Sequence, residues 1–351
     1  MCPLDTCGWA APRPYGENTR PQPWACAPCG ASGAGPVGGC GGRCGSWIFW
    51  SAGWRLNVLG VRRRDRFGRL GGVVGVVVTP FSGSGRVDGG GVGAVVERLV
   101  SGGVSVVVAG GDFGEFSGLS GGEVRQVVDV AVDVARGRAV VFGAVGGDLE
   151  SAVAAARYAG FRGVDGVFVH PPVGAVGEGW VVYHRVLADS VPSVGVVVRA
   201  DFVSAREVSA LVDACPNVVG VVVGGGDPVR AGVVARDVGL ERVVWLSGGG
   251  ELGVPGHSVY GVSGFLSTVA VVLPELSLRL HAALGKGDLP GAMAVWDVVR
   301  PLVELPHPVA VVKEALALLG VCGAGVRAPS PVLSVEGRAV VASVLTRWGL
   351  R

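Results

Sequence analysis

Short runs of apolar, mostly β-branched residues recur along the chain from about residue 72. They occupy 73–78, 104–110, 139–145, 164–170, 194–199, 218–223, 242–247 and 259–264. Near-continuous apolar runs of this length are typical of strands that are buried on both faces. Between them lie helix-length segments with apolar residues spaced by three or four positions, most clearly at 87–102, 120–137, 148–160 and 204–215. Two of these begin with the pattern of a capping box, Ser120 with Glu123 and Ser204 with Glu207.

Eight strand-like runs that alternate with helices predict a closed (β/α)8 barrel, the TIM barrel. A doubly wound open sheet is the alternative, but eight evenly spaced units favour closure. After residue 266 the pattern becomes helical throughout, which predicts a C-terminal helical appendage. We therefore expect a Cys-, Gly- and Pro-rich leader at 1–70, the barrel at 71–265 and the helical region at 266–351.

The composition of the 351 residues narrows the class of protein. Hydrophobic residues make up 49% of the chain and the formal net charge is only +2, so the overall charge gives no basis for a nucleic-acid partner. No uncharged apolar run reaches the length of about 18 residues that a membrane span needs. Six of the eight cysteines lie in the first 44 residues, and the others, Cys215 and Cys322, form no disulfide or metal pattern. The barrel is therefore expected to be a reduced, cytoplasmic protein.

The cysteines of the leader raise a separate question. Cys26 and Cys29 form a C-x2-C pair, and Cys40 and Cys44 form a C-x3-C pair after ten intervening residues. Thiolates at such spacings can bind one zinc ion in a short ribbon. The intervening segment, however, is rich in glycine and lacks strand-forming residues. The competing interpretations are a disordered leader, or translated sequence upstream of a start near Gly71. No cofactor or metal is expected in the barrel.

Longer motifs occur in a fixed order after the expected strands. They are "VVVTPFSGSGRVD" (76–88), "GGDFGEFSGLSGGE" (110–123), "VHPPV" (169–173), "ACPNVVGVVVGGGD" (214–227), and "VVKEALALLG" with "GVRAP" near the C-terminus. In this order and spacing, the chain resembles the dihydrodipicolinate synthase / N-acetylneuraminate lyase superfamily of Schiff-base aldolases over about residues 72–330. The branch it most resembles is 5-dehydro-4-deoxyglucarate dehydratase. The resemblance implies a TIM barrel, lyase or dehydratase activity on a keto-sugar acid, a small carboxylate or sugar-acid ligand, and a homo-oligomer.

The positions at which this family performs its chemistry hold other residues here. The lysine that forms an imine with the keto acid corresponds to Val222, and the tyrosine that relays protons corresponds to Arg199. An imine requires a neutral primary amine, which valine cannot supply. The chain has two lysines, Lys286 and Lys313, and both are predicted to lie at the surface. The usual imine mechanism is therefore predicted to be lost.

Arg199 instead introduces a permanent positive charge at the barrel mouth. It could bind a carboxylate through two hydrogen bonds, or it could pair with Asp112, Glu115 or Asp201 and fill the emptied site. The family threonine that holds the substrate carboxylate corresponds to Phe113, and Asp112 before it would repel that carboxylate. A changed ligand is therefore favoured over the inherited one.

Three further residues complete the candidate site. His170 ends the fourth strand and could act as a general base, although a structural role beside two prolines is the favoured interpretation. Ser263 and Ser267 lie near the eighth strand and match the family pattern. The substrate-binding candidates are thus Asp112, Phe113, Glu115, His170, Arg199, Ser263 and Ser267.

Two classes of function follow from these residues. The first, by ancestry, is a lyase or dehydratase that acts on a keto-sugar acid. The second is a barrel that has lost its Schiff-base chemistry and binds a ligand or a partner subunit without turnover. Acid–base chemistry by His170, Glu115 or Asp201 without an imine is a third option. Val222 together with Arg199 favours the second class, since the imine route is closed at these positions.

Overall fold

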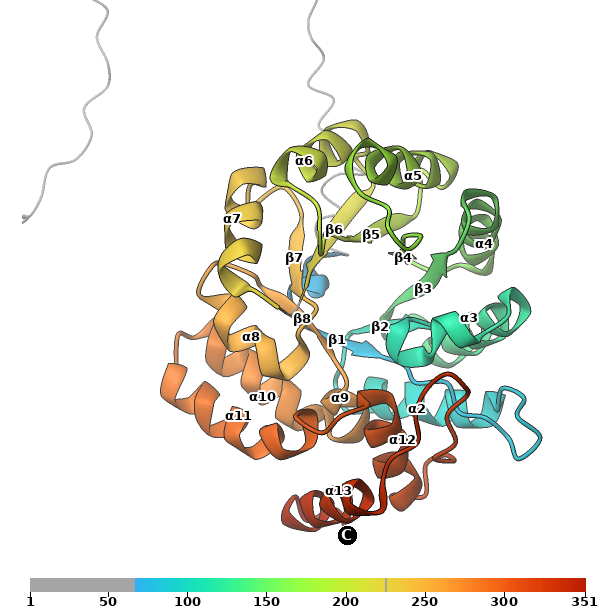
Figure 1. Cartoon of the computed structure of the whole chain (residues 1–351), viewed down its shortest axis with the longest axis vertical. Coiled ribbons are helices and arrows are strands. Elements are labelled where there is room, and N and C mark those ends of the chain that lie inside the picture. The colour runs from blue at the N-terminus through green and yellow to red at the C-terminus, as the bar shows by residue number, and fades with distance from the viewer. Residues whose placement is uncertain (1–66, 225) are drawn as a thin grey trace, which may run out of the picture. The chain divides into compact units, whose positions relative to one another are not determined.

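The computed structural model describes residues 67–224 and 226–351, which form a closed parallel barrel (Figure 1). The strands follow one another around the barrel in sequence order, and β1 pairs with both β2 and β8. They are β1 (Val73–Val76), β2 (Val106–Ala109), β3 (Val140–Gly146), β4 (Gly166–His170), β5 (Gly195–Arg199), β6 (Val218–Val223), β7 (Val244–Ser247) and β8 (Gly264–Ser267). This closed order confirms the predicted TIM barrel and excludes the doubly wound open sheet.

Helices follow the strands and cover the outside of the barrel (Figure 1). They are α2 (Gly89–Ser101), α3 (Gly121–Ala135), α4 (Leu149–Arg162), α5 (Gly177–Ser190), α6 (Ala205–Ala214), α7 (Pro228–Val238) and α8 (Gly250–Ser258). Both predicted capping boxes are present: the hydroxyls of Ser120 and Ser204 accept from the backbone N–H groups of Glu123 and Glu207, whose carboxylates accept in return. These bonds satisfy N–H groups that a helix leaves without a partner, and they define where α3 and α6 begin.

The eighth strand lies further along the chain than predicted. Residues 259–263 form the turn after α8, and β8 begins only at Gly264. The apolar run resembles a strand in composition, but Gly261 has a φ of 93°, which a strand residue does not adopt. β8 ends at Ser267, two residues beyond the expected barrel boundary at 265.

Side chains alternate along each strand between the interior of the barrel and the layer beneath the helices. In β6, Val222 belongs to the interior cluster, while Val221 and Val223 pack beneath the helices. His170 and Arg199 each lie two positions after an interior residue of their strand, so the same alternation turns both side chains inward. Three strand ends therefore direct their last inward side chains to the same opening.

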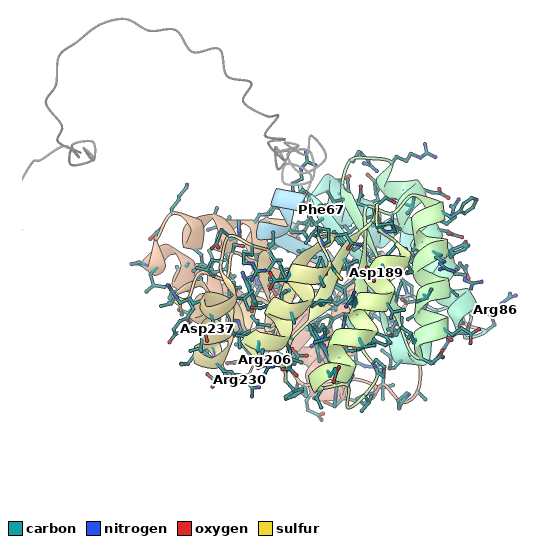
Figure 2. All side chains as sticks on the ribbon, turned by 90° about the horizontal axis from the view of Figure 1, so that it is seen from above. Phe67, Arg86, Asp189, Arg206, Arg230 and Asp237 are labelled. Atoms are coloured by element: carbon teal, nitrogen blue, oxygen red, sulfur yellow. The ribbon has the colours of Figure 1, made fainter. Side chains whose placement is uncertain are left out.

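The amino-terminal end of the barrel is filled by side chains near the 3-10 turn η1 (Gly68–Gly71). The ring of Phe67 joins the interior cluster and lies 6.0 Å from the ring of Phe142. Gly195 makes room for it, because a Cβ atom there would lie 2.6 Å from Phe67 Cζ. Figure 2 shows Phe67 at the opposite end of the barrel from Arg206, which is in the first turn of α6. The carboxyl ends of the strands therefore form the mouth.

The C-terminal helical region packs on one side of the barrel, beside α2 and α8 (Figure 1). It contains α9 (Val269–Val272), α10 (Pro274–Gly285), α11 (Leu289–Val303), α12 (Pro308–Leu318) and α13 (Val335–Arg347). α12 also contacts the 3-10 turn η2 (Asp112–Gly114), which follows β2. The appendage thus reaches the mouth of the barrel.

Within the described part of the chain, no helix has the length and apolar character that crossing a membrane requires.

His184 in α5 is a fully buried histidine in the outer layer. Its Nδ1 lies 2.7 Å from the carbonyl oxygen of Trp180, and its ring packs 4.3 Å from the Trp180 ring. Its Nε2 has no hydrogen-bond partner among the described residues. Burial disfavours the charged imidazolium and lowers the pKa of His184 from 6.5 to about 4.

Because His184 is buried in its neutral form, we expect the free energy of unfolding to decrease at acidic pH. A lowered pKa contributes stability that is present above pH 6.5 and is lost as the pH falls toward 4, by about 3 kcal/mol in total. We expect the free energy of unfolding of His184→Gln to fall less than that of the wild type over this range, measured by urea denaturation. His307→Asn, which removes an exposed histidine, is the matched control. Parallel curves for the wild type and His184→Gln would contradict the prediction.

Candidate functional site

A cavity of about 560 Å³ opens at the carboxyl ends of β4 and β5, and we call it the mouth cavity. Its charged and titratable lining consists of Asp112, His170, Arg199 and Asp201. Its large apolar lining consists of Phe116, Pro171, Pro172, Val173, Trp180, Phe202 and Val203. TIM-barrel enzymes place their sites among the loops at this face of the barrel, so the mouth cavity is the candidate functional site.

Arg199 bridges two loops of the mouth through ion pairs. Its Nη1 pairs with Oδ2 of Asp112, in the loop after β2. Its Nη2 and Nε both donate to Oδ2 of Asp201, over 2.8 Å and 3.0 Å. Of the three carboxylates predicted as partners, the structure brings these two to Arg199, while Glu115 is bound elsewhere. The charge of the guanidinium is thus offset within the protein itself.

His170 reaches the same network from β4. Its Nδ1 lies 3.1 Å from Oδ1 of Asp112, and its ring stacks on Phe116 with 4.7 Å between centroids. Burial raises the pKa of Asp112, but the hydrogen bond and charge of His170, with the charge of Arg199, outweigh it and lower that pKa. The Nε2 atom is enclosed and has no hydrogen-bond partner among the described residues. His170 therefore orients Asp112 and presents no open nitrogen to the cavity.

The centre of the mouth is apolar. Val222 is fully buried in the barrel interior, and Phe113 packs from above against the cluster to which Val222 belongs. The backbone covers Val222 closely as well, since a Cβ atom on Gly248 would lie 3.2 Å from Val222 Cγ1. Neither residue offers a nucleophile, a proton or a charge to a bound molecule. The polar groups of the site lie to one side of this apolar centre.

The prediction that both lysines lie at the surface is wrong for Lys313 and right for Lys286. Lys286 is exposed in the turn after α10. Lys313, in α12, is fully buried: its Nζ pairs with Oε1 of Glu115 and donates to the carbonyl oxygen of Gly325 over 2.8 Å. Its Nζ also lies 4.2 Å from the ring centroid of Phe81. Burial lowers the pKa of Lys313, and the hydrogen bond and charge of Glu115 oppose that shift.

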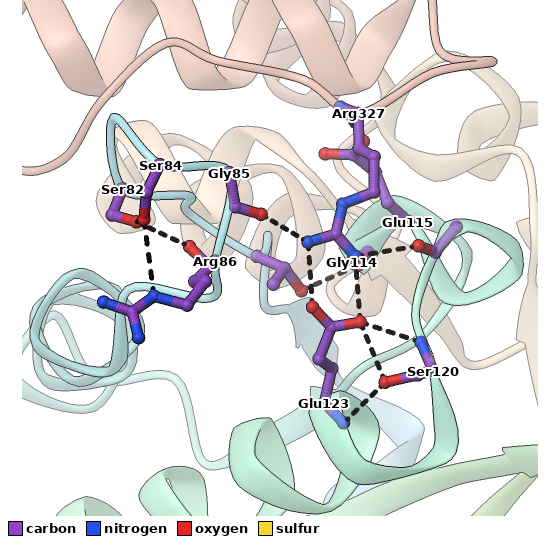
Figure 3. A network of polar contacts seen from close by, with 11 residues as sticks. Ser82, Ser84, Gly85, Arg86, Gly114, Glu115, Ser120, Glu123 and Arg327 are labelled. Atoms are coloured by element: carbon purple, nitrogen blue, oxygen red, sulfur yellow. Dashed lines mark hydrogen bonds and ion pairs between the residues drawn. The ribbon is translucent and has the colours of Figure 1, made fainter.

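Glu115 is a structural residue rather than part of the cavity lining. It adopts a left-handed φ of 61°, which is unfavourable for a residue with a side chain. Its Oε2 accepts from the backbone N–H of Arg327 over 2.8 Å, while its Oε1 faces Lys313. Figure 3 shows how Arg327 continues this contact by binding both carboxylate oxygens of Glu123, over 2.8 Å and 2.9 Å. The C-terminal segment therefore fixes the loop that carries Asp112.

Neither candidate serine directs its side chain into the mouth. Ser263 is exposed and precedes β8, so it sits at the amino-terminal end of the barrel. Ser267 is fully buried and faces the outer layer, because it lies one position after the interior residue Leu266. Its hydroxyl bonds to Glu251, whose carboxyl group has its pKa raised by burial. The sequence placed both serines near β8 but could not show which face or end they occupy.

Metal ligands do not gather anywhere in residues 67–224 and 226–351: no group of three or more His, Cys, Asp or Glu side chains is placed to hold an ion there. Cys26, Cys29, Cys40 and Cys44, the expected zinc ligands, lie outside the described residues.

The apolar wall of the cavity was not predicted from the sequence. Phe116 and Phe202 follow the ends of β2 and β5 by a few residues, and this position was the available signal. Trp180 comes from α5, where it is buried and donates its indole N–H to the carbonyl oxygen of Arg199 over 3.1 Å. The wall thus gives the charged network an apolar neighbour on which part of a ligand can pack.

Comparison with known proteins is consistent with this architecture. The model of the dihydrodipicolinate synthetase family matches residues 69–347. A 4-hydroxy-tetrahydrodipicolinate synthase of Hyphomonas neptunium is 31% identical over 290 residues, which cover 80% of this chain and 98% of that protein. A probable 5-dehydro-4-deoxyglucarate dehydratase of Bacillus licheniformis is 26% identical, over 76% of this chain and 89% of that protein. The crystal structure of dihydrodipicolinate synthase from Oceanobacillus iheyensis superimposes with a TM-score of 0.77 at 26% identity, covering 84% and 100% of the two chains.

The buried pair of Glu115 and Lys313 predicts a strong energetic coupling. Lys313→Met leaves an unpaired buried carboxylate, and Glu115→Gln leaves an unpaired buried ammonium, so each is expected to cost about 3–5 kcal/mol of unfolding free energy. The double variant removes both charges and should lose much less than the sum, measured in urea as a double-mutant cycle. Lys286→Met, at the exposed lysine, should change stability by less than about 0.5 kcal/mol. Additive losses in the cycle would contradict the coupling.

Proposed function

The chain belongs to the dihydrodipicolinate synthetase family, since the family model matches residues 69–347, and on this premise we propose that it is a ligand-binding barrel that forms no imine. The observation that carries the proposal is the apolar centre of the mouth, where Val222 lies in the interior cluster and Phe113 packs against that cluster. In the resembling family, these positions hold the imine-forming lysine and the threonine that binds the substrate carboxylate. Here both are apolar, so the covalent step has no nucleophile and the carboxylate has lost a donor.

No other lysine is placed to take over the covalent step. Lys313 is enclosed between α12 and the loop after β2, with its amine bound to Glu115. To attack a carbonyl, that amine would have to leave its partner and cross the packed protein to the mouth cavity. Lys286 lies in the turn after α10, outside the cavity lining. The arrangement of both amines therefore supports binding without an imine.

The acid–base alternative has less support than binding alone. Of its three candidates, Glu115 is bound to Lys313 and Arg327, and the Nε2 atom of His170 is enclosed. Asp201 accepts two hydrogen bonds from Arg199 on one oxygen, and its other oxygen is buried. A general base needs an acceptor within reach of the proton it removes, and none of these groups offers an open one.

A lyase or dehydratase acting on a keto-sugar acid is the second candidate. Relatives with the names of a synthase and a dehydratase favour it, as does Arg199, which keeps two of its five N–H donors free of the bonds described above. Those donors could hold a small carboxylate. A cytoplasmic location and assembly with further copies of the chain are expectations of the same family resemblance.

Borohydride trapping separates the two candidates. We expect intact mass to show no reduced adduct after the wild-type protein is treated with pyruvate, or with a longer 2-keto acid, and borohydride. Phe113→Thr combined with Val222→Lys should form the adduct, because the new amine would face an uncovered cavity. Val222→Lys alone should react more slowly, since Phe113 still packs against the cluster that contains this position.

The measurement has a direct control and a clear opposing result. Lys286→Met should give the same result as the wild-type protein, with no mass added by the treatment. Circular dichroism establishes that each variant is folded. An adduct on the wild type that disappears in Lys313→Met would contradict the proposal, because it would show that the buried lysine reaches the ligand.

A further inference from the structure

The charged groups of the mouth cavity do not suit an anion. Two of them, Asp112 and Asp201, carry carboxylates, and one, Arg199, carries a permanent positive charge. His170 is the remaining titratable group in the lining. With a neutral imidazole the lining has a net charge of −1, and with a protonated imidazole it has a net charge of zero. In neither state is there positive charge left over for a ligand carboxylate.

The pairing and exposure of these charged groups also favour a cationic ligand. Asp201 binds Nε and Nη2 of Arg199 with a single oxygen, and this contact alone balances the guanidinium. Asp112 is then the additional negative charge, with its side chain 52% exposed at the cavity. The low pKa of Asp112 keeps this carboxylate ionised at neutral pH. The group of the network most open to a ligand is therefore an anion.

The rest of the lining is apolar and includes aromatic rings. Phe116 stacks on His170, and Phe202 is 78% exposed at the rim of the cavity next to Asp201. The face of an aromatic ring attracts an organic cation, and large exposed apolar side chains beside a cavity offer surface for an aliphatic group. Val173, which is fully exposed, adds to this rim.

We propose that the mouth cavity binds a small organic cation, an ammonium or guanidinium group attached to an apolar body, in place of a keto acid. The inference rests on the proposed non-imine function, since it assigns the ligand class of the same site. The cationic nitrogen lies against Asp112, and the apolar body packs on Phe116 and Phe202. A volume of about 560 Å³ accommodates a small molecule of this kind.

Three probes that share a 2-methylpropyl group test the charge preference. 3-Methylbutylamine is the cation, 3-methylbutan-1-ol is its neutral counterpart, and 4-methyl-2-oxopentanoate is the keto acid. Binding is followed by the indole N–H signal of Trp180 in titrations monitored by NMR, since this side chain lines the cavity. We expect the amine to bind at least about tenfold more tightly than the keto acid. Asp112→Asn should weaken the affinity for the amine by a similar factor and leave the affinity for the alcohol unchanged.

Asp237→Asn is the matched control, because Asp237 is exposed near the end of α7 and lies outside the cavity lining. It should leave all three affinities unchanged. Equal or tighter binding of the keto acid would overturn the inference, as would an amine affinity that does not respond to Asp112→Asn, or no binding of the amine at its solubility limit. Keto-acid binding that equals or exceeds amine binding, without a borohydride adduct, would overturn this ligand class alone, whereas an adduct would overturn the proposed function as well.

Discussion

The pairing of Glu115 with Lys313 is the contact on which the geometry of the mouth depends. The loop after β2 leaves the barrel through a residue held in a left-handed conformation, which has a cost of about 1–2 kcal/mol for a non-glycine residue. That conformation persists because Lys313 and the N–H of Arg327 hold both carboxylate oxygens. Asp112 lies three residues before Glu115. Its position against Arg199 is therefore set by a helix almost two hundred residues further along the chain.

The unusual residues of the mouth form a mutually compatible set. An arginine at the end of β5 would leave an uncompensated charge in a half-buried position, and Asp112 and Asp201 remove that cost. His170 completes the hydrogen bonding of Asp112 from the neighbouring side. At the centre, Val222 belongs to the interior apolar cluster, and Phe113 packs against that cluster. Each charged group of the site therefore has a partner within the protein, and its apolar groups pack on one another.

Sequence patterns were sufficient for the barrel and for the contents of the polar network, but not for buried contacts between distant segments. Apolar runs located seven strands because each strand is buried on both faces. Residues 259–264 were wrongly predicted to be the eighth strand, because Val259 and Val262 are apolar and β-branched although they flank a turn. Asp112, His170 and Arg199 could be found because they end strands or follow them. Lys313 could not, since its partner lies 198 residues away and a lysine in a helix is usually exposed.

The apolar cluster that contains Val222, with Phe113 packed against it, also determines what a substitution at the centre of the mouth would meet. A lysine at the end of β6 would place its amine in this apolar cluster, with no carboxylate-binding hydroxyl at position 113. A threonine at position 113 would supply the hydroxyl, but Val222 would still offer no amine to a carbonyl. The pattern of the resembling family therefore differs at both positions, and at Arg199 as well, where that family has its proton-relaying tyrosine. The chemistry open to this mouth thus depends on several side chains at once, because they share one apolar cluster and one charged network.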